Sequence, residues 1–330
     1  MFDSAATANA GVDASASASS SMRPAVSPTA SAVSTASPRA PTSRRQPIEG
    51  SCLTPAGRPS PVDSRRAKRP ACRGAEIIEH GAADGTPRYA CVFRSAAIEK
   101  RAPLPLVVFF PGQDETPTKV ARETGLRKLL ETVDLAGDPG HLGFILLAPQ
   151  ARRLDGRIRF DVEHIADENE DAVATDRFIE VVAKRGWIDR RRIYAVGDGV
   201  GGEMAALYAM LRPNRVAAFA SYAGNAGGLK WTCSEEPPPA AIVYRACDTI
   251  SKCLEMEQWL RRREEAHAPT MSLRLGAFDR LEPSCDLDRS QCKQNKGTAN
   301  HLRWPKGKER EVLGFLGRYS LVEPTDSNEL

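Results

Sequence analysis

The sequence lacks the features that assign a protein to a membrane or to a nucleic acid. It has no run of 18 apolar residues, which excludes a transmembrane helix of ordinary length. The first thirty residues have neither the basic start nor the apolar core of an export signal, so none is expected in the chain as written. The net charge is only +4, from 46 basic and 42 acidic residues, and this balance predicts no nucleic-acid-binding surface.

Closely spaced cysteine pairs are also absent, which excludes the CxxC motifs of zinc and redox sites. We therefore expect no metal and no cofactor. The eight cysteines form an even set: Cys52, Cys72, Cys91, Cys233, Cys247, Cys253, Cys285 and Cys292. Structural disulfides in a secreted or extracytoplasmic protein are the expectation, and reduced thiols in a cytoplasmic protein are the alternative.

Three groups of cysteines follow from their places along the chain. Cys72 and Cys91 flank a predicted hairpin and are expected to pair. Two further groups border later loops. One group is Cys247 and Cys253, and the other is Cys285 and Cys292. Disulfides are expected either within each group or between the two groups. Such bonds would stiffen these loops. Cys52 and Cys233 are left without an assigned partner.

Aromatic residues are scarce at the N-terminus. Phe2 is the only aromatic residue before residue 70, and Ala, Ser, Thr and Pro dominate without any hydrophobic period. Such a segment buries too little apolar surface to offset its chain entropy, so a disordered tail is predicted over residues 1–70 and one domain over residues 71–330. The tail could be a surface-tethering linker or adhesive stalk, or an extension without a role.

The rest of the chain alternates between strand and helix patterns. Strands are expected at 75–79, 88–93, 106–110, 144–149, 193–196, 216–222, 241–244 and 271–275, and helices at 119–133, 171–184, 203–211, 255–265 and 309–319. The first two strands flank a turn and predict a hairpin. Continuous apolar runs such as 106–110 are typical of parallel strands buried on both faces. The pattern predicts an α/β fold with a mostly parallel central sheet and helices on both faces.

A glycine-rich turn separates the strand that ends at Val196 from the following helix. It reads Gly197-Asp198-Gly199-Val200-Gly201-Gly202. A nucleophile elbow has this place and spacing, because its sharp turn needs small residues two positions to either side of the apex. The apex is then Gly199, which should have a positive φ. A dinucleotide loop fits less well, since the spacing is not GxGxxG and no ribose-binding acid follows at a suitable distance.

Around this turn, residues 188–197 and 201–205 resemble the active-serine region of polyhydroxybutyrate depolymerases and related feruloyl and acetylxylan esterases. Residues 104–112 resemble the family's first core strand and oxyanion loop, with Pro-Gly where His-Gly is usual. The resemblance implies an α/β-hydrolase fold over residues 104–319. It also implies Gly199 in place of the nucleophilic serine, Asp248 as the acid and His301 as the base. The oxyanion loop would comprise Gly112, Gln113 and Val200.

Without a hydroxyl at the apex, the family's acyl-enzyme cannot form. The sequence therefore predicts a catalytically silent esterase relative that binds an ester, an acyl sugar, or a polyester or polysaccharide surface. The alternative is an ester hydrolase of unusual mechanism, in which Asp198 attacks or His301 activates a water molecule. Asp198 as the apex would place Val196 and Val200 where crowding demands small residues. The sequence does not predict the oligomeric state.

Overall fold

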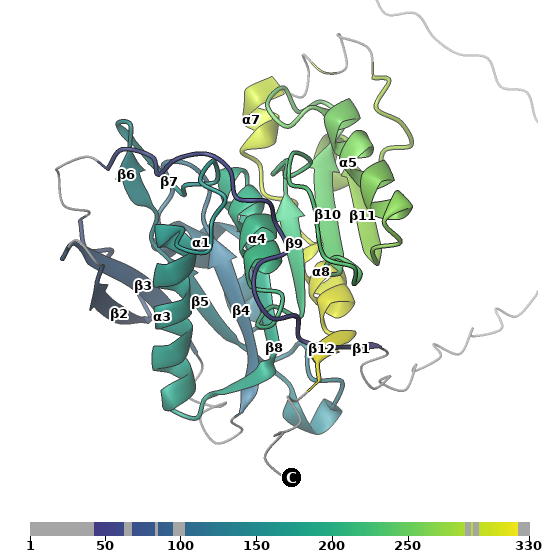
Figure 1. The fold of residues 1–330 in the computed structure, drawn as a ribbon. Helices are drawn as coiled ribbons and strands as arrows, with labels where there is room; N and C mark the ends of the chain where they lie inside the picture. The colour runs from purple at the N-terminus through teal and green to yellow at the C-terminus, as the bar shows by residue number, and fades with distance from the viewer. Residues whose placement is uncertain are drawn as a thin grey trace, which may run out of the picture. The chain divides into compact units, whose positions relative to one another are not determined.

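An eight-stranded sheet organises the protein (Figure 1). The computed structural model describes residues 43–62, 68–82, 85–94, 103–287, 292 and 297–322. The sheet order is β11-β10-β9-β8-β4-β5-β3-β2. Its strands are β2 (Glu76–Gly81), β3 (Pro87–Phe93), β4 (Leu104–Phe110), β5 (Ile145–Pro149), β8 (Ile188–Asp198), β9 (Ala218–Tyr222), β10 (Ala240–Arg245) and β11 (Thr270–Leu275). Strands β2 and β3 form the predicted antiparallel hairpin, β3 is antiparallel to β5, and the other neighbours are parallel, which confirms a mostly parallel sheet.

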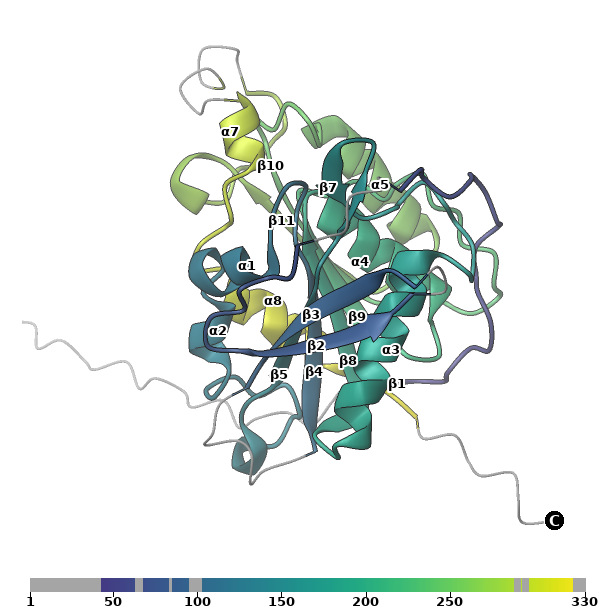
Figure 2. The same ribbon diagram turned by 90° about the vertical axis from the view of Figure 1, so that its left-hand side faces the viewer.

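Helices cover both faces of the sheet, as Figure 2 shows from the side. One face carries α3 (Glu170–Lys184), α4 (Val200–Leu211) and α5 (Cys253–Glu265), and the other carries α1 (Pro117–Glu123), α2 (Leu126–Leu129) and α8 (Glu309–Leu316). All of β4 is buried, and its side chains alternate between two hydrophobic clusters. Val108 packs with the first set of helices and Val107 with the second. The core is therefore split into two layers by the sheet.

Two predicted helices differ from those observed. The helix expected over 119–133 is wrong, because Gly125 with φ +57° breaks it into α1 and α2, and the Thr124 hydroxyl donates to the Val120 carbonyl at 2.7 Å. The closing helix ends at Leu316, and strand β12 (Tyr319–Leu321) follows it. Smaller elements are β6 (Arg152–Leu154), β7 (Arg157–Arg159), η2 (Pro139–His141), η3 (Ala277–Asp279) and α7 (Gly297–His301). Within the described residues, no helix has the length and apolar character needed to span a bilayer.

The predicted tail is wrong over residues 43–62, which we call the N-terminal strap. Strand β1 (Ser43–Arg45) pairs in parallel with β12, and Leu53 bridges to Trp231. Cys52 forms a disulfide with Cys233, and the described residues belong to one compact unit. The strap depends on partners that lie far away in the sequence, so its local composition could not reveal it. Residues 1–42 lie outside the described residues.

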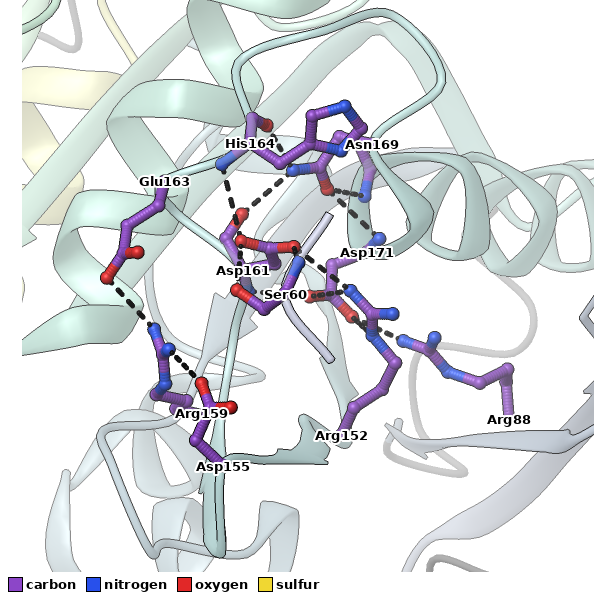
Figure 3. Close-up of polar contacts among 11 residues, drawn as sticks. Ser60, Arg88, Arg152, Asp155, Arg159, Asp161, Glu163, His164, Asn169 and Asp171 are labelled. Atoms are coloured by element: carbon purple, nitrogen blue, oxygen red, sulfur yellow. Dashed lines mark hydrogen bonds and ion pairs between the residues drawn. The ribbon is translucent and has the colours of Figure 1, made fainter. Parts of the chain in front are cut away.

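A buried polar network holds the far end of the strap (Figure 3). The carboxylate of Asp161 accepts from the backbone N–H of Ser60 at 2.8 Å and from the Ser60 hydroxyl at 2.9 Å. Asp171 accepts from the backbone of Asp161 at 2.8 Å, from Arg88 at 2.5 Å and from Arg152 at 3.1 Å. Burial alone would raise the pKa of Asp171, but the charges of the two arginines outweigh it and lower that pKa.

The substitution Asp171→Asn should destabilise the protein by about 3–5 kcal/mol near neutral pH, because it removes the carboxylate that pairs with buried Arg88 and Arg152. Arg152 then keeps only Asp161 as a carboxylate partner, at 3.7 Å. Urea unfolding followed by circular dichroism would measure this loss. The carboxylate contributes its stability above its unfolded-state pKa of about 4, and that stability is lost as the pH falls through the lower folded-state pKa. The gap between the native protein and the variant should therefore narrow in acid.

Glu180 supplies the matched control, since it also pairs with two arginines, Arg190 and Arg215, but nearer the surface. Glu180→Gln should cost about 1 kcal/mol or less. If both variants lose the same free energy of unfolding, the buried network does not stabilise the protein more than the surface pair does.

Candidate active site

The apex of the turn between β8 and α4 is Gly199, with φ +53° and ψ −123°. The predicted positive φ is therefore confirmed at the carboxyl end of a central parallel strand. The Gly199 N–H donates to the Tyr222 carbonyl at 2.8 Å. Its own carbonyl accepts from Gly202 at 2.8 Å and from Glu203 at 3.1 Å, which starts the helix. The apex is thus held by hydrogen bonds from both sides.

The neighbouring glycines are required by close backbone contacts. A Cβ atom on Gly197 would lie 1.9 Å from the Gly201 carbonyl oxygen. A Cβ on Gly201 would lie 2.0 Å from the Phe110 carbonyl oxygen. Both contacts are far shorter than any real Cβ contact, so the two positions flanking the apex admit only glycine in this backbone.

Asp248 and His301 form a buried pair. Asp248 follows β10, His301 ends α7, and the Nδ1 atom of His301 lies 2.8 Å from Oδ2 of Asp248, as predicted. The other oxygen of Asp248 accepts from the backbone N–H groups of Ile250 and Ser251 at 2.8 and 3.0 Å. A neutral ring that donates Nδ1–H to the carboxylate presents Nε2 as an acceptor.

Burial lowers the pKa of His301, but the hydrogen bond and charge of Asp248, with the charges of Asp198 and Glu203, outweigh it and raise that pKa above its usual value. This shift favours the protonated form of the ring.

Gly199 faces the free nitrogen of this histidine. A Cβ atom built on Gly199 would lie 3.2 Å from Nε2 of His301 and 3.9 Å from Cε1. The structure thus brings Gly199, Asp248 and His301 together in the predicted arrangement. The distance of 3.2 Å is shorter than most Cβ contacts. A side chain at Gly199 would therefore require His301 to move by a few tenths of an ångström.

Two disulfides crosslink the loops that carry Asp248 and His301. Cys247 bonds to Cys292, and Cys253 bonds to Cys285. These bonds join the two later groups of cysteines, one of the arrangements expected from the sequence. The predicted Cys72–Cys91 bond is confirmed, and the unassigned Cys52 and Cys233 bond to each other. All eight cysteines are paired.

Asp198 is the last residue of β8, paired in sheet register with Tyr222, so it lies beside the apex and does not form it. Burial and then the charge of Glu115 raise its pKa to about 7, against the opposing charge of His301. Burial also raises the pKa of Glu203. His301 therefore interacts with three acidic groups, Asp248, Asp198 and Glu203.

The loop after β4 packs against the elbow. A Cβ on Gly112 would lie 3.2 Å from the Asp198 carbonyl oxygen, and the Gly112 N–H donates to the carboxylate of Glu115 at 3.1 Å. Glu115 also forms an ion pair with Lys119. Gln113 is exposed at the tip of this loop. The N–H of Val200, the first residue of α4, has no partner inside the helix. The Glu115 carboxylate thus occupies the Gly112 N–H, which is one of the donors expected to bind an oxyanion.

One small cavity lies beside the histidine. A cavity lined by Asp198, Tyr222, Arg245 and His301, among others, holds about 10 Å³, which is the space of at most one water molecule. In the part of the chain that the structure describes, no group of three or more His, Cys, Asp or Glu side chains could hold a metal ion.

Comparisons with known proteins identify the fold. No family model matches the chain, and no curated protein sequence is similar to it. A thermostable esterase superposes with a TM-score of 0.53 at 15% identity over 76% of this chain, and the chain spans 64% of that protein's length. Esterase 2 of the planctomycete Thermogutta terrifontis superposes with a TM-score of 0.46 at 17% identity, over 74% of this chain and 98% of that protein. The chain has the α/β-hydrolase fold, as predicted.

Asp248→Asn should lower the pKa of His301 below the value for a free histidine, about 6.5, because burial remains while the main source of stabilisation for the charged ring is lost. Titration of the ring nitrogens by ¹⁵N NMR would measure both proteins. A histidine whose pKa is unchanged by the substitution would show that the two side chains do not interact in solution.

Proposed function

We propose that the protein is a catalytically silent relative of the carboxylesterases and polyester depolymerases of the α/β-hydrolase fold. The observation that carries this proposal is the 3.2 Å between the position of a Cβ on Gly199 and Nε2 of His301. A serine there would stand at the nucleophile position of the fold, with His301 as its base and Asp248 as the acid. Glycine has no atom to attack a carbonyl carbon.

The expected loss of activity is large. Removal of the nucleophile alone from the protease subtilisin costs about 10⁶ in kcat, or roughly 8 kcal/mol. The remaining contributions here are also weak, because Glu115 already accepts from Gly112 in the loop proposed to bind the oxyanion with Gln113 and Val200. A binding role for an ester, an acyl sugar, or a polyester or polysaccharide surface agrees better with these residues.

Asp198 is the second candidate as a nucleophile. Its raised pKa of about 7 leaves much of the carboxyl protonated at neutral pH, and a protonated carboxyl is a poor nucleophile. It also lies in extended strand backbone, one residue before the turn. Water attack assisted by His301 is the remaining hydrolytic route, with Nε2 of the neutral ring as the proton acceptor.

The four disulfides support a location outside the cytoplasm, where thiols oxidise and remain oxidised. A secreted or surface-held protein would meet polymers and acyl groups of the cell exterior, which are the ligand classes proposed here.

Gly199→Ser should create an ester hydrolase, because the new hydroxyl would lie within reach of His301 after a small shift of the ring. Assays with short and aromatic p-nitrophenyl esters and with feruloyl esters should show turnover and labelling by a fluorophosphonate, whereas the native protein should show neither. Gly314→Ser, at an exposed helix position with open space, is the matched control and should stay inactive. His301→Ala added to Gly199→Ser should abolish the new activity.

Hydrolysis by the native protein would reject the silent-relative proposal. An acyl adduct on Asp198 and loss of turnover in Asp198→Asn would then establish the aspartate route. Turnover that survives Asp198→Asn and disappears in His301→Ala would establish water attack. A folded Gly199→Ser variant that is neither active nor labelled would reject the assignment of Gly199 as the nucleophile position.

A further inference from the structure

A second cavity, of about 700 Å³, lies away from His301 and is lined by basic side chains. We call it the basic groove. Its walls are the segment before β2, the start of α1, and the region from Gln150 through β6 to β7. The lining residues include five cationic ones: Lys68, Arg69, Arg73, Arg122 and Arg153. The volume is within the range of ordinary ligand sites.

The charge of the groove is uncompensated. No acidic residue is among its lining residues, and among the residues that the structure describes none of the five cations has a carboxylate within ion-pair distance. Arg153 donates only to the carbonyl of Gly156, at 2.9 Å. Five like charges around one cavity repel one another and attract anions.

Another arginine-lined cavity of the same molecule differs in this respect. A cavity of about 500 Å³ beside β8 is also lined by arginines, among them Arg190 and Arg215. Both pair with the carboxylate of Glu180, at 2.6 and 2.8 Å. The arginines of that cavity are therefore paired with a carboxylate, whereas those of the basic groove are not.

The neutral lining residues narrow the class of ligand. Thr116 and Thr118 supply hydroxyl groups, and the buried amide of Gln150 donates to the Lys68 carbonyl at 3.0 Å, which positions one wall. No aromatic side chain is among the lining residues, so the stacking platform typical of sites for single-stranded nucleic acid is missing there. Hydroxyl groups and arginines together suit a polyhydroxylated ligand that carries oxyanions.

We infer that the basic groove binds an acidic polysaccharide, through carboxylate or sulfate groups repeated along the chain of sugars. The disulfides support a location outside the cytoplasm, where acidic polysaccharides occur, and this agrees with the ligand class. The basic groove is separate from the turn at Gly199 on which the proposed function rests, although the loop from β4 to α1 contributes to both. Gly112 of that loop packs on Asp198, and Thr116 lines the groove.

The test measures binding of the full-length native protein to three fluorescent probes by anisotropy. The probes are an oligogalacturonate, a heparin oligosaccharide and a single-stranded oligonucleotide of similar charge, with a neutral dextran as the blank. A triple variant, Lys68→Gln, Arg73→Gln and Arg122→Gln, removes three exposed cations of the groove. The matched control, Arg58→Gln, Lys128→Gln and Arg261→Gln, removes three exposed cations that do not line it.

We expect saturable binding of at least one acidic oligosaccharide, weaker at higher salt, and at least about a tenfold loss of affinity in the groove variant only. The carboxylate and sulfate probes tell which oxyanion the groove prefers. The inference is overturned by the absence of saturable binding, by equal losses in the groove and control variants, or by oligonucleotide binding that is as tight and as sensitive to the groove variant. Ester hydrolysis by Gly199→Ser that is unchanged when the groove substitutions are added would separate this result from the proposed function of the turn at Gly199.

Discussion

The close passage of α4 across the ends of β4 and β9 is the constraint on which the site depends. Gly201 meets the Phe110 carbonyl, and a Cβ on Gly224 would lie 2.5 Å from the Gly199 carbonyl oxygen. These contacts belong to the packing of the sheet and its helix, so they hold the apex in place whatever side chain it carries. The backbone shape of the turn is therefore set by the fold and does not depend on a side chain at Gly199.

Charge is distributed unevenly around this scaffold. Asp248, Asp198 and Glu203 all act on His301, and the Glu115 carboxylate takes a backbone donor beside the elbow. An acidic surrounding opposes the build-up of negative charge that acyl transfer requires. The basic groove has the opposite character, and the loop from β4 to α1 connects the two regions. The proposed anion binding therefore belongs to the basic groove, and the acidic groups surround Gly199 and His301 in a different part of the molecule.

The parts of the fold predicted from sequence are those with a strong local pattern. The apolar run at 106–110, the hairpin and the glycines around Gly199 each predicted the local structure that is observed, whereas Asp248 and His301 were identified through the family resemblance. The strap was missed because its contacts, such as Cys52 with Cys233, are long-range. The basic groove escaped notice because Lys68, Arg122 and Arg153 meet only in the folded chain, and a balanced net charge hides such a cluster.

The pairing of β1 with β12 gives the molecule a defined response to mechanical tension. A pull on Ser43 and Val322 loads the two parallel strands in shear, so their hydrogen bonds resist together. Once they part, the covalent path runs from Ser43 to Cys52 and crosses directly to Cys233. Every residue between those two cysteines, including the elbow, lies off that path. A copy stretched in this way would lose the pairing of its terminal strands first, while β8 and α4 lie off the covalent path that bears the load.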